Sequence, residues 1–367
     1  MQRRRIPGLD GIRAVAILMV IVFHICQRYG LTNPHTKTGV GLYFLLGLGG
    51  DGVSIFFVLS GFLITALLCQ EYEDNGRISF SGFYLRRTFR ILPPLYCYLL
   101  FLVLFCAAVH YPLRLETIAG SALFYRNYFL QSGQWLTEHT WSLCVEEQFY
   151  LLWPVALRWA LHRGGKAFAA KLAATLIVVA PLLRIAIKLH HPHDLTYPIA
   201  TMLPTRMDSL MSGGLTALVL GSRKFEAVYR SVARVWWLLP VEFMLLPGVA
   251  RFTVGNIYRD SIGYTVDSIF IALFLVWVAR NEGNWVGAIL NSRLMVALGV
   301  MSYSAYIWQT FFIHPANPTW ANRLPWSLAS IWLVAALSYY FIEQPSLRLR
   351  RRIERRWRRD SAVANPA

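Results

Sequence analysis

The chain has 367 residues, of which 56% are hydrophobic and only 15% are charged. An average soluble domain has about 25% charged residues, so this composition argues against a soluble protein. Apolar runs recur along the whole length, which indicates one polytopic helical membrane domain.

The sequence predicts an all-α membrane protein with about ten transmembrane helices. Residues 1–346 are expected to form the membrane domain, and residues 347–367 a basic tail. The expected spans are 12–30, 49–68, 91–111, 147–162, 168–188, 207–221, 235–250, 262–279, 294–313 and 327–344.

The net charge of +17 would suit a nucleic-acid partner, but the positions of the charges point elsewhere. If the N-terminus lies inside, the inner segments hold 25 of the 36 Lys and Arg residues and the outer segments hold 10. This is the positive-inside bias of multi-pass membrane proteins. We therefore expect both termini to be cytoplasmic and expect no nucleic-acid partner.

The first apolar run carries two ionisable residues, Arg13 and His24, separated by eleven positions. On a helix they share one face and lie roughly 16 Å apart along the axis. An ionisable pair within one membrane helix is costly to bury, which favours a function. The alternative is an interfacial arginine and a histidine that a neighbouring helix satisfies.

In the second run, glycines precede Asp51, and Ser60 and Gly61 follow within the apolar stretch. Small residues allow close contact between helices, and this packing explains Ser60 without any function. Asp51 at the outer mouth is the stronger functional candidate.

Three arginines, Arg86, Arg87 and Arg90, lie at the inner edge of the third run. Topology alone would place basic residues there. The functional interpretation is an anion clamp, because guanidinium groups bind phosphate in a bidentate manner.

Two carboxylates, Glu146 and Glu147, are expected to enter the membrane from the outer side. An interfacial belt explains the aromatic residues around them but not the glutamates. Since His24 is expected at the same outer side, a hydrogen-bonded pair of His24 and Glu146 is plausible.

Further polar residues lie in later runs. Arg206 and Asp208 begin the sixth span as a charged pair, and Tyr303 and Gln309 lie inside the ninth. The basic tail from Arg348 is expected to contact anionic membrane lipid.

Neither a metal site nor a disulfide is predicted. A cluster in an outer loop lacks the spacing that places ligands on one helical face. Its members are His190, His191, His193 and Asp194. The five cysteines lack metal spacing, and a disulfide between Cys26 and Cys144 is the minor alternative.

Together these residues predict an outer and an inner site. The outer site would contain His24, Glu146, Arg206 and Asp208, and the inner site Arg13, Arg86, Arg87 and Arg90. A histidine oriented by a carboxylate can remove a proton from a hydroxyl, and arginines can hold a phosphorylated donor. The pattern indicates a cytosolic donor whose long arm reaches a hydroxyl acceptor at the outer mouth. A transporter or flippase for an acyl or sugar substrate is the alternative.

Seven motifs in order resemble the acyltransferase-3 family. They are L-D-G-x-R with a histidine eleven residues after the arginine, F-F-V-L-S-G-F-L, R-R-x-x-R-I-x-P, W-S-L-x-x-E-x-x-F-Y-x-x-x-P, R-x-D-x-x-x-x-G, S-Y-S-x-Y and E-x-P. They extend from Leu9 to Pro345. The resemblance implies a membrane-bound O-acyltransferase of the bacterial inner membrane that decorates surface polysaccharides or related molecules.

The resemblance further implies acyl-CoA, commonly acetyl-CoA, as co-substrate, with no bound cofactor. The acceptor would be a hydroxyl of a glycan or lipid-linked sugar on the far side of the membrane. By motif, the catalytic residues would be His24 as base, with Arg13 and Glu146. The donor-binding residues would be Arg86, Arg87 and Arg90. The acceptor-side candidates are Asp51, Ser60, Arg206, Asp208, Tyr303 and Gln309.

The chain departs from the family pattern in two ways. Some relatives carry histidine where Gln309 stands, so a second imidazole is not expected to be needed. Some relatives append a soluble esterase-like domain, which this sequence does not show. The membrane domain is therefore expected to deliver the acyl group to the acceptor itself or to a separate partner.

Overall fold

The computed structural model describes residues 6–29, 48–128, 135–191, 199–313 and 320–364. All regular structure in these ranges is helical, which confirms the expected all-α class. The longest helices are α1 (Leu9–Arg28), α3 (Leu48–Asn75), α4 (Phe80–Ala108), α7 (Trp141–His190), α8 (Leu203–Val219), α10 (Leu238–Val254), α11 (Tyr264–Arg280) and α16 (Gln344–Ala364). Shorter helices are α5 (Leu115–Ala122), α6 (Trp135–Glu138), α9 (Arg223–Ala233), α12 (Trp285–Leu290), α13 (Arg293–Val300), α14 (Ser302–Ile313) and α15 (Trp326–Ser338). Single turns of tighter or wider helix are η1 (Arg126–Tyr128), η3 (Arg259–Gly263), η4 (Trp320–Asn322) and η5 (Tyr339–Glu343).

In the described residues, six helices are long and apolar enough to cross a membrane, and up to eight if each of two bent pairs is one span. The bent pairs are α9 with α10 and α13 with α14. The chain is therefore a polytopic membrane protein. Helix α7 also contains a break at Gly164 and Gly165, where Gly165 has a φ of 63° that favours glycine. The two spans expected at 147–162 and 168–188 lie on either side of this break.

Helices α3 and α8 pack so closely that two glycines are required at their contact. A Cβ atom at Gly61 would lie 1.7 Å from the carbonyl oxygen of Leu210, and one at Gly213 would lie 2.0 Å from that of Val58. Backbones approach this closely only where no side chain intervenes. The contact explains the glycine of the F-F-V-L-S-G-F-L motif.

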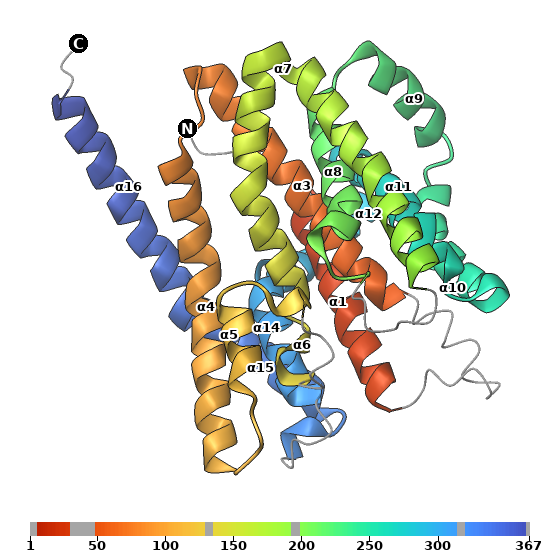
Figure 1. Cartoon of the computed structure of the whole chain (residues 1–367). Helices are drawn as coiled ribbons and strands as arrows, with labels where there is room; N and C mark the ends of the chain where they lie inside the picture. Colours follow the sequence, from red (N-terminus) through yellow and green to blue (C-terminus); the bar gives the residue numbers. More distant parts are fainter. Residues whose placement is uncertain (1–5, 30–47, 129–134, 192–198, 314–319, 365–367) are drawn as a thin grey trace.

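Helix α4 and the first half of α7 run antiparallel. The Tyr98 hydroxyl of α4 donates to the carbonyl of Leu136 in α6 at 2.7 Å, and the Tyr84 hydroxyl donates to that of Leu151 at 3.0 Å. Tyr98 lies well inside α4, so the segment before α7 folds back against the middle of that helix. Helix α7 therefore begins inside the bundle, not at its rim (Figure 1).

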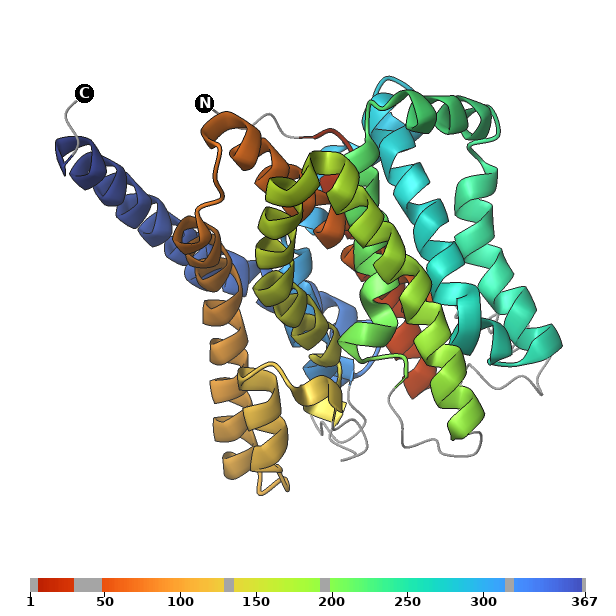
Figure 2. The same ribbon diagram turned by 45° about the horizontal axis from the view of Figure 1, so that its top comes forward.

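Helix α16 extends away from the other helices on the side of α4, as two views show (Figures 1 and 2). Its first turn is fixed by the Ser346 hydroxyl, which donates to the Phe89 carbonyl at 2.6 Å. Beyond that turn its arginines at 351, 352, 355 and 356 are exposed. The basic tail is thus helical through Ala364.

Candidate active site

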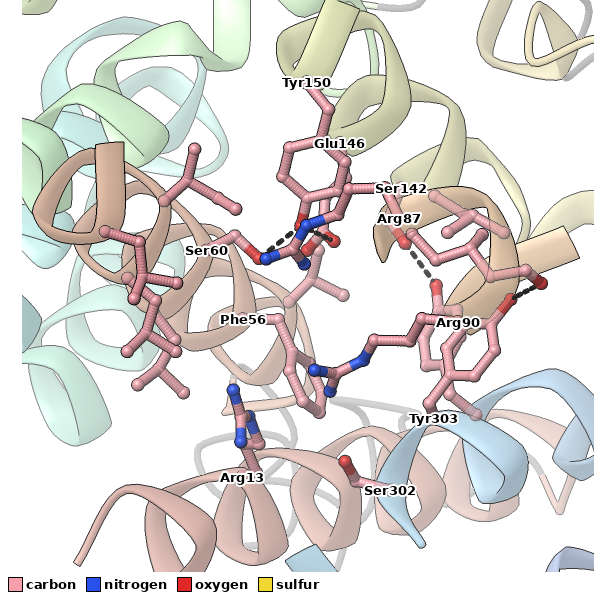
Figure 3. A pocket seen from close by; sticks show the side chains of 18 residues that line it. Arg13, Phe56, Ser60, Arg87, Arg90, Ser142, Glu146, Tyr150, Ser302 and Tyr303 are labelled. Carbon is pink, nitrogen blue, oxygen red and sulfur yellow. Dashed lines mark hydrogen bonds between the residues drawn. The ribbon is translucent and has the colours of Figure 1, made fainter. Parts of the chain in front are cut away.

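A cavity of about 180 Å³ lies between α1, α3, α4, α7 and α14. Helices α1, α4 and α7 supply its charged side chains, Arg13, Arg87, Arg90 and Glu146. Figure 3 shows the three guanidinium groups turned toward one space around Phe56. The other polar lining residues are Ser60, Ser142, Tyr150, Ser302, Tyr303 and Tyr306.

The arginines of the cavity are only partly neutralised. Arg13 pairs with Asp10 at 2.8 Å, whereas the Arg87 guanidinium lies over the Tyr150 ring, 5.0 Å from its centroid. Within the described residues, neither Arg87 nor Arg90 has a carboxylate oxygen within 4.0 Å. Guanidinium groups that converge without partners form a site for an anion such as a phosphate.

Glu146 lies in this cavity and not beside His24. Its carboxylate accepts from the Tyr150 hydroxyl at 2.8 Å, and that hydroxyl also lies 2.9 Å from Ser60 Oγ. The expected pair of His24 and Glu146 is therefore not formed. The reason is that α7 begins inside the bundle, which carries Glu146 to the depth of Arg87.

Other residues that the sequence assigned to the donor or acceptor site also lie where the sequence did not predict them. Arg86 does not line the cavity but faces Glu71 at 3.2 Å and Glu354 at 3.9 Å. Ser60 and Tyr303, predicted on the acceptor side, line the cavity with the arginines, and the Tyr303 hydroxyl donates to the Ile91 carbonyl at 2.7 Å.

The rest of the cavity wall is aliphatic. Leu59, Leu63, Ile64 and Leu67 line it from one face of α3, with Val53 and Phe56 nearer the helix start. The cavity therefore joins an anion-binding end to a surface suited to a thin, largely apolar chain.

His24 lies on the same helix as Arg13 but does not line the cavity. Its Nδ1 is 3.3 Å from Gln309 Oε1, and its ring meets the edges of Phe23 and Trp135. The side chain is partly exposed, whereas Gln309 is fully buried. The structure therefore joins one predicted catalytic residue to one predicted acceptor-side residue.

Tyr306 lines the cavity and also contacts a second histidine, His139. The Tyr306 hydroxyl donates to the His139 carbonyl at 2.6 Å and lies 2.6 Å from Ser142 Oγ. Its ring meets that of Phe56 edge to face, with 6.3 Å between centroids. These two aromatic rings therefore form one part of the cavity wall.

His139, which the sequence analysis did not select, has both ring nitrogens occupied. Nε2 is 3.1 Å from the Ile307 carbonyl, and Nδ1 is 3.0 Å from Thr310 Oγ1. Since a carbonyl only accepts, Nε2 carries the hydrogen and Nδ1 accepts from Thr310. His139 thus has no free nitrogen to act as a base. The sequence around His139 does not show by itself whether this histidine is catalytic.

Arg206 and Asp208 belong to a separate buried network. Arg206 donates to Ser54 Oγ at 2.9 Å and lies over the Tyr264 ring, 3.6 Å from its centroid. Asp208 pairs with Arg184 at 2.8 Å and not with Arg206. The sequence analysis missed Arg184, because its partner comes from another helix.

Asp51 also has a partner outside the cavity, Arg259 at 2.8 Å. Asp51, Arg206 and Asp208 therefore tie α3, α7, α8 and the start of α11 together. Their contacts are those of a structural network.

The other residues that the sequence analysis considered are the cysteines and the histidine-rich loop. All five cysteines are free thiols, including Cys26 and Cys144. No group that could hold a metal ion occurs in the described ranges. His193 and Asp194 of the histidine-rich loop lie outside those ranges.

Comparisons with known proteins found a matching family and several relatives. A family model described as an acyltransferase domain matches residues 6–343. A Staphylococcus aureus strain COL protein, provisionally named as an O-acetyltransferase, is 29% identical over 371 residues, which are 93% of this chain and 57% of the relative. The O-acetyltransferase OatA of Staphylococcus aureus strain NCTC 8325 is 27% identical over 369 residues, which are also 93% of this chain and 57% of the relative.

The chain spans a little over half the length of these curated relatives. No solved structure shows a significant match. The family model, in contrast, covers nearly the whole chain, from the turn before α1 to the end of η5. The chain therefore belongs to the acyltransferase 3 family and carries its acyltransferase domain.

Proposed function

We propose that this chain is an integral-membrane O-acyltransferase that transfers an acyl group, with acetyl as the expected one, from acyl-CoA to a hydroxyl. Acetyl follows from the names of the relatives, which are O-acetyltransferases. The acceptor would be a glycan or lipid-linked sugar on the outer side of a bacterial inner membrane. The observation that carries the proposal is the arrangement along α1, with an arginine-lined cavity at Arg13 and, further along the same helix, His24, whose Nδ1 faces Gln309 Oε1.

The cavity supports a donor that enters from the cytoplasm. The positive-inside bias of the sequence supports an orientation in which both termini are cytoplasmic. Arg87 and Arg90 would bind the phosphates, while the aliphatic face of α3 would contact the thin arm that carries the acyl group. The arm would point toward Tyr306 of α14, about one turn before Gln309, which contacts His24.

His24 would act as the general base. It would remove the proton of the acceptor hydroxyl as the hydroxyl oxygen attacks the acyl carbonyl carbon. His139 cannot replace it, since both of its ring nitrogens are engaged. Glu146 would act at the donor end, where it holds Tyr150 and Ser60 in the cavity wall.

The test is turnover of radiolabelled acetyl-CoA by purified protein in detergent, with a soluble sugar as acceptor. Wild type should release CoA and label the sugar, and His24→Ala should lose this activity. His190→Ala is the matched control, because His190 is exposed at the end of α7. Wild type that binds acetyl-CoA but transfers no label would favour the transporter alternative.

A further inference from the structure

Gln309 is fully buried and lies directly against His24. Its Oε1 is 3.3 Å from His24 Nδ1. A carboxamide oxygen only accepts hydrogen bonds, so Nδ1 carries the ring hydrogen in this contact. The other nitrogen, Nε2, then holds the lone pair that a general base needs.

An amide NH₂ turned to the Nδ1–H of His24 would oppose it, because both groups are donors. Gln309 therefore presents its oxygen to the ring and its NH₂ elsewhere.

That NH₂ group has no hydrogen-bond partner among the residues that the structure describes. Buried donors are almost always bonded, so an unbonded one beside a candidate base indicates a group that a substrate satisfies. A fixed N–H in a dry site is the kind of donor that stabilises the oxyanion formed during acyl transfer.

Trp308 also has an unbonded ring N–H in the described part of the chain, but it does not compete for this role. Its ring packs against Tyr98 and Phe101 of α4, on another face of α14. Of Trp308 and Gln309, it is Gln309 that contacts His24.

We propose that Gln309 serves the reaction through both ends of its carboxamide. The oxygen holds His24 in the form with hydrogen on Nδ1, and the NH₂ donates to the acyl carbonyl oxygen as negative charge develops there. This inference rests on the proposed function and adds a second residue at the reacting atoms.

The step balances with groups already named. The acceptor hydroxyl oxygen forms a bond to the acyl carbon, and its proton moves to His24 Nε2. The carbonyl electron pair moves onto oxygen, where the Gln309 N–H bonds it. The pair returns as the carbon–sulfur bond breaks, and the departing thiolate takes the proton from His24 to give CoA with a free thiol.

Two substitutions separate the two roles. Gln309→Glu keeps an oxygen acceptor for Nδ1–H but removes the N–H donor, whereas Gln309→Met removes both. We expect kcat to fall about 10²- to 10³-fold in each, with the KM for acetyl-CoA changed less than about threefold. The ¹⁵N NMR spectrum of His24, assigned by difference with His24→Ala, should keep hydrogen on Nδ1 in Gln309→Glu and lose that preference in Gln309→Met.

Gln148→Met is the control, because Gln148 donates to the Phe124 carbonyl at 2.8 Å and to Asn127 at 3.0 Å, away from His24. It should change neither kcat nor the His24 spectrum. Wild-type kcat in Gln309→Glu would overturn the donor role, and an unchanged spectrum in Gln309→Met would overturn the tautomer role. If wild type itself transfers no acetyl group, the proposed function fails, and the spectrum still decides whether Gln309 sets the tautomer.

Discussion

Arg184 and Asp208 form an ion pair of 2.8 Å in which neither side chain is exposed. Arg184 also donates to Thr265 Oγ1 at 2.9 Å, and Thr265 donates to Asp208 at 2.5 Å. The three residues join α7, α8 and α11. The aspartate of the R-x-D motif is thus held by residues of two neighbouring helices.

Removing one member of this pair should destabilise the protein without affecting donor affinity. Arg184→Met leaves the Asp208 carboxylate buried without its charge partner, which typically costs about 3–5 kcal/mol. We expect a lower melting temperature in detergent and an unchanged Kd for acetyl-CoA. Lys188→Met is the control, since the half-exposed pair of Lys188 and Asp260 contributes about 0–1 kcal/mol. Equal losses in the two variants would contradict the structural role.

The contact of α3 with α8 should not tolerate a methyl group. Gly61→Ala would place Cβ 1.7 Å from the Leu210 carbonyl oxygen, so the helices must separate. Overpacking of this kind costs about 1–3 kcal/mol or more, which should appear as a lower melting temperature. Gly283→Ala has nothing within 4 Å of the added Cβ and should leave stability unchanged. A stable Gly61→Ala protein would show that the helices are less closely packed.

The two cavity arginines without ion pairs should determine donor affinity. Arg87→Met and Arg90→Met each remove a charged donor from the cavity, and a charge-assisted hydrogen bond contributes about 1.5–3 kcal/mol. The KM for acetyl-CoA should therefore rise about 10- to 150-fold, measured by CoA release. Arg86→Met should have a much smaller effect, because Arg86 faces Glu71 and Glu354. A similar rise of the KM in all three variants would mean that donor affinity depends on the net charge of the protein and not on binding in the cavity.

Glu146→Gln tests whether Glu146 acts through Tyr150, as in the structure, or through His24, as the sequence suggested. Glutamine can still accept from Tyr150, so the cavity wall should persist while one negative charge beside the donor phosphates is lost. We expect the KM for acetyl-CoA to fall and the ¹⁵N spectrum of His24 to stay unchanged. A changed His24 spectrum would restore the direct pairing of Glu146 with that histidine.

The exposed arginines of α16 should bring the helix onto anionic lipid. Leu349 and Trp357 are 50% and 47% exposed, so an apolar contact accompanies the charge. Each basic residue near such a surface contributes about 1 kcal/mol. Brominated anionic lipid in nanodiscs should quench Trp357, identified by difference with Trp357→Phe, more than brominated zwitterionic lipid does. Substituting glutamine for the arginines at 351, 352, 355 and 356 should remove that difference, and its persistence would argue against lipid binding by this helix.

Local features of the sequence were enough to predict the helices but not all of their breaks. Most expected spans coincide with a helix, because an apolar run in a bilayer must satisfy its backbone internally. The span expected at 294–313 is instead divided between α13 and α14, which are bent by 70°, and the described residues offer six to eight candidate spans where about ten were expected. The sequence did not reveal that α7 starts beside the middle of α4. That position depends on how the segment from α5 to α6 folds back, and its buried polar residues gave no periodic signal.

The sequence by itself determined that this chain is a helical membrane protein, and its motifs predicted Arg13, His24 and the arginines as the reactive set. Hydropathy, charge bias and residue type are properties of short stretches, so they can be read without the fold. Only the tertiary structure decided which groups meet: Glu146 with Tyr150, Asp208 with Arg184, and His24 with Gln309. These partners come from different turns or helices, and their contacts depend on where each helix begins and how closely its neighbours pack.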